Sequence, residues 1–144
     1  MVEDHRAEGE AVNYLGSIDL QSGEVTVLTR GHDFYSSPTV SPNGDQIAFM
    51  SWNHPDMPWD ETIIWTSNLD ENGLLSEPIQ VAGGKKGAQK ISAQQPIFSP
   101  SGELFFITDE SGWWNIYRQG TKESVFPMEA EFGGPHWVFG MHSY

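Results

Sequence analysis

Short apolar runs alternate with turn sequences along the chain, and one arrangement of the two occurs twice. Residues 37–44 and 95–102 both read x-Pro-x-x-Ser-Pro-x-Gly, and a nearly continuous apolar run follows each, at 47–50 and 104–107. Proline presets φ at the first position of a turn and glycine accepts a positive φ later in it, so each copy predicts a β-hairpin. Apolar runs of this length predict strands that are buried on both faces.

A second hairpin follows each copy of the pattern. The paired runs are 62–65 with 78–81 and 114–117 with 124–126, and a similar pair, 14–19 with 25–28, opens the chain. Two hairpins per repeat give four strands, which is the unit of a propeller blade. We therefore predict an all-β fold, a partial β-propeller built from four-stranded antiparallel blades.

The repeats divide the chain as a single partial propeller domain, residues 1–144. A half-blade is expected at about 12–29, complete blades at about 38–81 and 96–126, and the first strand of a further blade from 135. A β-sandwich is the alternative that short strands at this spacing also permit. Repetition of hairpin pairs rather than of single strands favours the propeller. WD repeats are disfavoured because neither Trp-Asp nor Gly-His recurs at the right place.

The predicted blades leave the ring open, since closed propellers use about 4–8 of them. An open ring presents unpaired strand edges, which invite pairing with another chain. The chain is thus expected either to be a piece of a longer protein or to self-associate, and its complementary end segments suit a head-to-tail homodimer. A purely monomeric mass in solution would count against the dimer.

Charge and composition exclude several classes of partner and chemistry. The net charge is −13, from 7 basic and 20 acidic residues, which argues against nucleic acid and anionic membranes as partners. The chain has no cysteine, so disulfides and thiolate catalysis are excluded. The histidines lack the spacing of a metal site, and we expect no cofactor. Without a signal peptide or a run of ~20 apolar residues, the sequence predicts a soluble, cytoplasmic protein.

Five segments carry a resemblance to a known family. They are residues 13–15, 33–38, 52–60, 111–115 and 131–135. Through them the chain resembles, over nearly its whole length, the β-propeller of prolyl-oligopeptidase-family serine peptidases, of the acylaminoacyl-peptidase or dipeptidyl-aminopeptidase type. In that family the propeller caps an α/β-hydrolase domain and restricts the entry of large substrates.

The resemblance implies a peptidase accessory region rather than a peptidase. The family's Ser-Asp-His machinery belongs to the hydrolase domain, and this chain contains no Gly-x-Ser-x-Gly sequence. No set of nucleophile, base and orienting group can be assembled from the sequence. We therefore expect a non-catalytic binding or access module without catalytic residues. The alternative is a free-standing small protein that self-assembles into a closed propeller and binds a peptide or protein partner on its aromatic loop face.

The loop at 53–60 is the most distinctive candidate surface. The equivalent connection in the next blade spans only about 109–112, so this loop is an insertion. Aromatic residues beside fixed polar groups suit contact with a peptide or with a hydrolase domain. The alternative is that Trp52 and Trp59 pack beneath the loop as core. The predicted contact residues are Phe34, Tyr35, Trp52, His54, Asp56, Met57, Trp59, Asp60, Trp113 and Trp114.

Overall fold

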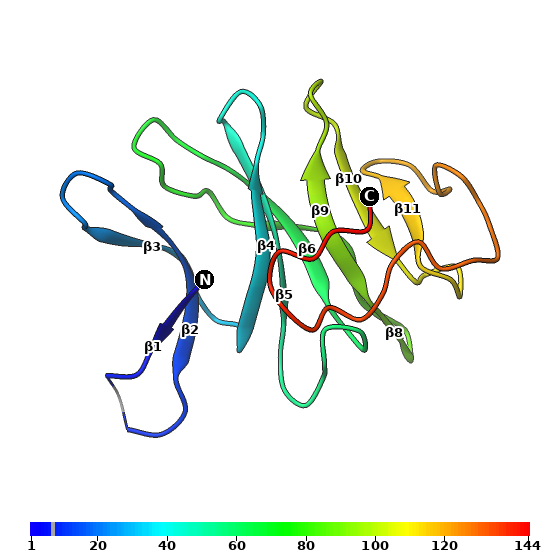
Figure 1. Ribbon diagram of the computed structural model, residues 1–144, viewed down its shortest axis with the longest axis horizontal. Helices are drawn as coiled ribbons and strands as arrows, with labels where there is room; N and C mark the ends of the chain where they lie inside the picture. Colours follow the sequence, from blue (N-terminus) through cyan, green and yellow to red (C-terminus); the bar gives the residue numbers. More distant parts are fainter. Residues whose placement is uncertain (7) are drawn as a thin grey trace.

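The computed structural model describes residues 1–6 and 8–144, and the regular elements in them are β-strands. The strands form three antiparallel sheets, of three, five and three strands, that follow one another from the N-terminal to the C-terminal part of the chain (Figure 1). This arrangement confirms the predicted all-β fold, a partial β-propeller. No helix that is long and apolar enough to cross a membrane occurs in the described residues.

The first sheet has the strand order β1-β2-β3. Its strands are β1 (Val2–Asp4), β2 (Val12–Ile18) and β3 (Val25–Thr29). Strands β2 and β3 form the hairpin that the sequence predicts at the start of the chain, with Ile18 opposite Val25. Strand β1 is an addition that the apolar pattern does not predict, because only Val2 of its three residues is apolar.

The central sheet has the order β4-β5-β6-β7-β8. Its strands are β4 (Phe34–Val40), β5 (Gln46–Trp52), β6 (Ile63–Asn68), β7 (Ile79–Lys86) and β8 (Gln89–Ile91). The stretch 83–94 resembles a connecting loop in sequence, but it contains the end of β7, all of β8 and the first two residues of β9. Gly87, with φ 65°, allows the tight turn between these two strands.

The third sheet has the order β11-β10-β9. Its strands are β9 (Ala93–Phe98), β10 (Leu104–Thr108) and β11 (Asn115–Arg118). The strand expected at 124–126 is not formed, which corrects that prediction. The segment contributes one backbone bond, from Val125 N–H to the carbonyl of Ile116 at 2.8 Å. Pro127 follows directly, and because proline has no N–H the pairing cannot extend in that direction.

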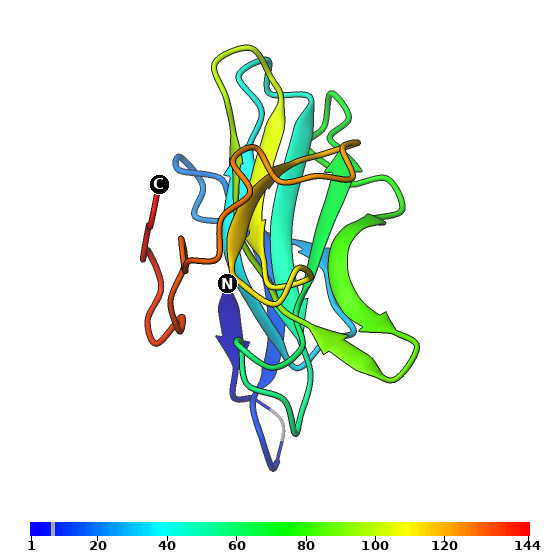
Figure 2. The same ribbon diagram turned by 90° about the vertical axis from the view of Figure 1, so that its right-hand side faces the viewer.

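The strand expected from residue 135 is not formed either. Residues 135–144 run as an irregular segment along one side of the sheets, and the β7–β8 hairpin projects on the opposite side (Figures 1 and 2). We call residues 135–144 the C-terminal segment. Its anchoring bonds run to Gln95 and not to a strand ladder. A strand needs a neighbour that pairs with its backbone groups, and without such a ladder the segment stays irregular.

Strand β5 is buried on both faces, as its apolar run predicts. Ala48 and Met50 point to one face and Ile47 and Phe49 to the other, because side chains alternate along a strand. The first pair packs against the third sheet, and the second pair packs against the first sheet. The remaining buried members of these two clusters are Ile64, Ala93, Leu104, Phe106 and Tyr117 on one side and Leu15 and Tyr35 on the other.

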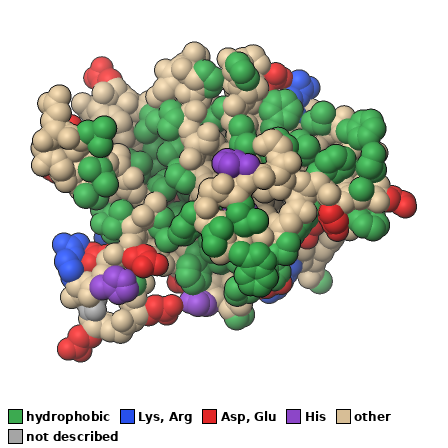
Figure 3. Space-filling view, viewed as in Figure 1, with side chains coloured by type: hydrophobic (Ala, Val, Ile, Leu, Met, Phe, Trp, Pro, Cys, Tyr) green, Lys and Arg blue, Asp and Glu red, His purple; other side chains and the backbone are tan. Residues whose placement is uncertain are grey.

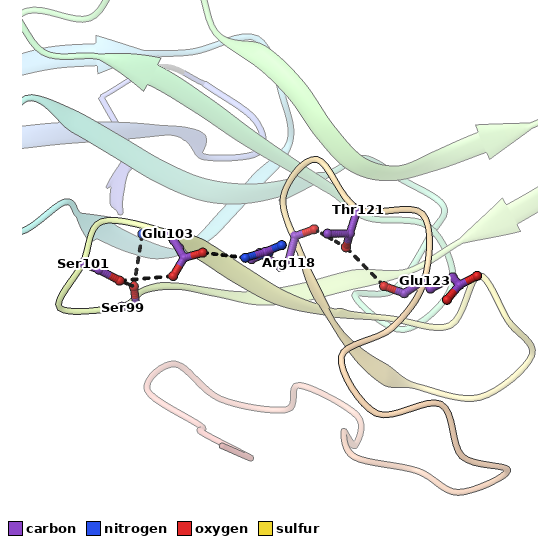
Figure 4. A network of polar contacts seen from close by, with 6 residues as sticks. All are labelled: Ser99, Ser101, Glu103, Arg118, Thr121 and Glu123. Atoms are coloured by element: carbon purple, nitrogen blue, oxygen red, sulfur yellow. Dashed lines mark hydrogen bonds and ion pairs between the residues drawn. The ribbon is translucent and has the colours of Figure 1, made fainter.

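A polar network joins the β9–β10 turn to β11 (Figure 4). Arg118 donates from Nη1 to Glu103 Oε1 at 2.7 Å, and the hydroxyl of Ser101 donates to Glu103 Oε2 at 3.1 Å. The bonds from Arg118 and Ser101 lower the pKa of Glu103 below its usual value. Because these groups are exposed, water screens their attraction, and the network fixes the geometry of the turn more than it stabilises the fold.

Candidate functional site

The loop at 53–60 connects β5 to β6 and folds as two successive turns. Asp56 N–H donates to the carbonyl of Asn53 at 3.0 Å, and Asp60 N–H donates to the carbonyl of Met57 at 2.9 Å. The carboxylate of Asp60 in turn accepts the N–H of Met57 at 2.9 Å. The loop therefore has its own set of hydrogen bonds, which hold its backbone in a defined conformation.

The loop is also tied to the third sheet through one carbonyl. The carbonyl of Pro58 accepts a bond from the hydroxyl of Ser92 at 3.0 Å and one from Gln94 Nε2 at 3.1 Å. Both donors are buried, and Gln94 also bonds Ser92 at 3.0 Å. A loop of the central sheet is thus held by side chains at the start of β9, so its position depends on how the two sheets pack.

Beside this loop lies an aromatic groove of about 240 Å³. Phe34 stacks on Trp52, with ring centroids 5.2 Å apart at 18°, and Trp59 contacts Trp137 of the C-terminal segment, with centroids 4.5 Å apart. Figure 3 shows the face of the molecule over which the C-terminal segment runs, and hydrophobic side chains gather there where the segment crosses the sheets. The full lining is Phe34, Ser36, Trp52, His54, Asp56, Met57, Pro58, Trp59, His136, Trp137, Val138 and Phe139.

The charged groups at the groove are paired with groups outside its lining. Asp56 forms an ion pair with Lys90 of β8, which raises the pKa of Lys90. His54 Nε2 lies 3.0 Å from Glu10 Oε1, and the His54 N–H donates to Asp33 Oδ2 at 2.8 Å. The polar rim is therefore largely compensated, and the chemistry that the groove offers is that of its aromatic rings.

Two further polar side chains of the groove lining, those of Ser36 and His136, also have polar partners. Ser36 Oγ lies 3.3 Å from Ser37 Oγ, and His136 Nε2 lies 3.2 Å from the carbonyl of Met141. Among the described residues, no group of three or more His, Asp or Glu side chains could hold a metal ion. The groove thus offers shape and apolar contact to a ligand.

Six of the predicted contact residues line the groove, and four do not. The six are Phe34, Trp52, His54, Asp56, Met57 and Trp59. Asp60 lies in the same loop, where its carboxylate closes a turn. Tyr35 is fully buried between the first and central sheets, so its prediction as a contact residue is corrected. Adjacent residues of a strand face opposite sides, and Phe34 therefore reaches the groove while Tyr35 reaches the core.

Trp113 and Trp114 lie apart from the groove, before β11. Trp113 is 40% exposed and lines a shallow hollow with Met128. Trp114 is half-buried, and its backbone N–H donates to Glu131 Oε2 at 2.7 Å. These two tryptophans belong to the third sheet, so they do not extend the aromatic groove.

Sequence reasoning does not select two sets of residues that build the site. Ser92 and Gln94 position the loop, but small polar residues at the start of a strand carry no distinctive signal. Residues 136–139 line the groove from the C-terminal segment, although the sequence pattern places them in a strand of a further blade. Their aromatic and apolar character is the signal that could have marked them as part of the groove.

No family model and no curated protein matches the chain. Solved structures do match it. A puromycin-hydrolyzing peptidase of Mycobacterium tuberculosis is 33% identical with a TM-score of 0.79, over 96% of this chain and 22% of that chain. A puromycin hydrolase is 32% identical with a TM-score of 0.73, over 85% and 18%. A mutant of puromycin hydrolase complexed with PGG is 33% identical with a TM-score of 0.72, over 81% and 18%.

The chain thus spans about a fifth of the length of these solved peptidases. The matched part covers most of the present chain. Over this part the chain is similar to the solved peptidases both in sequence and in fold. These matches confirm the resemblance that the sequence segments carry. Over most of its length, the chain is similar to the propeller region of puromycin hydrolases and prolyl-oligopeptidase-family peptidases.

Proposed function

We propose that this chain is a non-catalytic propeller module that binds part of a peptide-like substrate in the aromatic groove and so controls its access to a peptidase centre. The observation that carries the proposal is the groove between Phe34, Trp52 and Trp59. Stacked and tilted rings at fixed positions offer a large apolar contact area at little cost in conformational entropy. Such rings are the residues in which binding energy concentrates at protein interfaces.

The size of the groove limits which ligands can fit in it. Sites that bury a whole drug-sized molecule have about 300–1,000 Å³. The groove has about 240 Å³, which suits one large side chain rather than a complete ligand. Because the Asp56 and His54 side chains are already paired, an aromatic or large aliphatic side chain is favoured over a charged one.

The absence of a Gly-x-Ser-x-Gly sequence supports the non-catalytic part of the proposal. The chain corresponds to only 18–22% of the matched peptidases, so bond cleavage would depend on a separate hydrolase domain. In this proposal the module contributes recognition and entry, while nucleophile, base and oxyanion site come from elsewhere. Measurable hydrolysis of aminoacyl substrates by the chain alone, abolished by a serine-directed inhibitor, would contradict it.

Calorimetric titration of the chain with puromycin, the compound that the matched enzymes hydrolyse, tests the groove. Trp52→Ala and Trp59→Ala should each weaken binding about 30-fold, since interface tryptophans are worth about 2 kcal/mol or more. Trp113→Ala is the matched control, because Trp113 is exposed and lies outside the groove. Equal loss of affinity in all three variants, or no binding by the parent chain at millimolar puromycin, would overturn the proposal.

A second candidate function is self-assembly into a closed ring that binds a peptide or protein partner. It is favoured by exposed apolar side chains on both outer sheets. On the first sheet Val12 and Ile18 are 51% and 57% exposed, and beside the third sheet Val125 and Phe126 are 57% and 62% exposed. A head-to-tail homodimer would cover both sets. Light scattering should then give a dimer mass that Phe126→Glu lowers, and a monomer mass at all concentrations would exclude the dimer.

A further inference from the structure

A second cavity, larger than the aromatic groove, lies beside β4 and β9. These two strands are the edge strands at which the central and third sheets adjoin, and we call these edges the inner edges. Its volume is about 520 Å³, and it is lined by Met1, residues 36–39 of β4, residues 95–97 of β9 and residues 139–142 of the C-terminal segment. Ser36 and Phe139 line both the cavity and the aromatic groove, so the two adjoin. We call this space the inner-edge cavity.

Among the described residues, Gln95 makes the hydrogen bonds that hold the C-terminal segment at the inner-edge cavity. The side chain of Gln95 donates from Nε2 to Ser143 Oγ at 3.1 Å, and its Oε1 accepts the backbone N–H of Ser143 at 2.7 Å. The backbone carbonyl of Gln95 accepts the hydroxyl of Tyr144 at 2.7 Å. These three bonds act together as a latch at the end of the segment.

The chemistry of Gln95 suits recognition of a peptide backbone. The residue is only 3% exposed, and within the described residues its side chain has hydrogen bonds to the C-terminal segment alone. A primary amide combines a donor and an acceptor, as a peptide group does, and leaving a buried amide without partners is unfavourable. Because Oε1 accepts a backbone N–H, this contact does not depend on the side chain of the occupant.

The backbone at Gln95 presents this amide through an unusual conformation. Gln95 has φ 51° and precedes Pro96, and the pairing of β9 with β10 is irregular opposite this point. A positive φ in a residue other than glycine is unfavourable, and such residues persist where the surrounding structure holds them, often at ligand-binding positions. The bulge interrupts the strand and leaves Gln95 O and its side chain free to face the cavity.

Between its two ends, the C-terminal segment is only weakly attached to the sheets. Trp137 contacts Trp59, but Trp137, Val138 and Phe139 are 69%, 65% and 62% exposed. The segment therefore covers the cavity while leaving most of its own apolar surface in water. Any other extended segment could donate a backbone N–H to Gln95 Oε1, whereas the two remaining bonds need hydroxyl side chains such as those of Ser143 and Tyr144.

We propose that the inner-edge cavity is a peptide-binding site whose anchor is Gln95, and that the C-terminal segment covers it as an intramolecular strap. The occupant that competes with the strap is an extended, largely apolar peptide with a free backbone N–H opposite Gln95 Oε1 and a hydroxyl side chain opposite Gln95 Nε2. This site is distinct from the aromatic groove, which takes a side chain, whereas the inner-edge cavity takes a backbone. Opening of the strap is required before the peptide binds.

Fluorescence anisotropy with a labelled synthetic peptide of residues 135–144 tests the proposal on the 144-residue chain. Ser143→Pro removes both the N–H and the hydroxyl that bond Gln95 and so opens the strap, while the residues of β4 and β9 that line the cavity stay unchanged. Because a closed strap lowers apparent affinity by the fraction of open molecules, this variant should bind the peptide roughly tenfold more tightly than the parent. Equal affinity of the two chains would overturn the proposal.

Two further measurements examine Gln95 itself. In the Ser143→Pro background, Gln95→Ala should weaken peptide binding roughly tenfold, and the exposed Gln89→Ala should leave it unchanged. A peptide with N-methylserine in place of serine lacks the N–H opposite Gln95, and it should bind roughly tenfold more weakly to a protein that carries no change at Gln95. Full affinity of the methylated peptide would overturn the proposal whether or not Gln95→Ala folds. Puromycin binding to the parent chain, in which the strap is unchanged, tests the aromatic groove separately from these peptide measurements.

Discussion

Ser37 of β4 and Gln95 of β9 occupy the same place in the two sequence repeats, and both have φ 51° directly before a proline. The pairing of β4 with β5 shifts between Ser36 and Thr39, and that of β9 with β10 shifts at the matching position. Strands β4 and β9 are therefore each bulged where they line the inner-edge cavity. The shared conformation is a property of the repeat, and only the side chain differs, with the longer Gln95 reaching the C-terminal segment.

Substitutions at Ser37 should expose the cost of this conformation. A left-handed residue other than glycine costs about 1–2 kcal/mol, and β-branched residues tolerate it least. Ser37→Val should lower the free energy of unfolding by about 2 kcal/mol, whereas Ser37→Gly should change it by less than about 1 kcal/mol. Urea unfolding measures both. Ser17→Val, on the exposed face of β2, is the control, and equal effects of the two valines would contradict a strained Ser37.

Gly83 should not tolerate a side chain. Its φ is 80°, and a Cβ there would lie 1.8 Å from the carbonyl oxygen of Thr62 and 3.0 Å from Ala93 Cβ. Gly83→Ala should therefore destabilise the chain by roughly 3 kcal/mol or more, because backbone must move. Gly87 also has a positive φ but faces open space, so Gly87→Ala should cost only about 1 kcal/mol. Similar unfolding midpoints for the two variants would show that the strands separate easily at Gly83.

The hydroxyl of Thr62 should prove important for holding the central and third sheets together. Thr62 Oγ1 donates to the carbonyl of Ala93 and accepts the N–H of Ala93, both at 2.7 Å, and Thr62 is fully buried. Thr62→Val leaves both backbone groups without this partner and should cost about 2 kcal/mol or more. Thr62→Ser keeps the hydroxyl and should lose about half as much. Thr66→Val, in the following strand β6, is a control whose effect should be small in urea unfolding.

Local patterns in the sequence account for much of the fold. The turn residues correctly predict the hairpins β2–β3, β4–β5, β6–β7 and β9–β10. The apolar run of β5 predicts burial on both faces because alternation sends Ala48 and Phe49 to different neighbours. Local sequence patterns fail where strand formation depends on a partner strand from a distant part of the chain. Residues 124–126 and the C-terminal segment have strand-like composition, yet they lack the ladder partners that would make them strands.

The candidate groove is predictable only in part for the same reason. The loop at 53–60 is visible as an insertion, and its aromatic residues do line the groove. The contact of Trp59 with Trp137 joins residues far apart in the chain, and no local signal reports it. The anchoring of Pro58 by Ser92 and Gln94 is likewise invisible, because it results from the packing of two sheets.

Stability should fall when the pH is lowered through the titration of His32. The imidazole is half-buried against Tyr35 and Trp65, with ring centroids 5.8 and 5.5 Å away, and its Nδ1 lies 3.2 Å from Asn53 Nδ2. Burial lowers the pKa of His32 below its usual value of 6.5, and the hydrogen bond with Asn53 and the charge of Asp33 only partly oppose this effect. The neutral ring is therefore the form that the fold favours.

The sign of the effect follows from the lowered pKa. Above pH 6.5 the ring is neutral in both states and stability is retained, whereas below it the unfolded chain takes up a proton more readily than the folded one. The urea midpoint should therefore fall between pH 7 and pH 5, and His32→Gln should remove part of that fall. His5→Gln, at the exposed N-terminal end, is the matched control. An unchanged pH dependence in His32→Gln would mean that other groups carry it, and that burial of His32 has no thermodynamic consequence in this range.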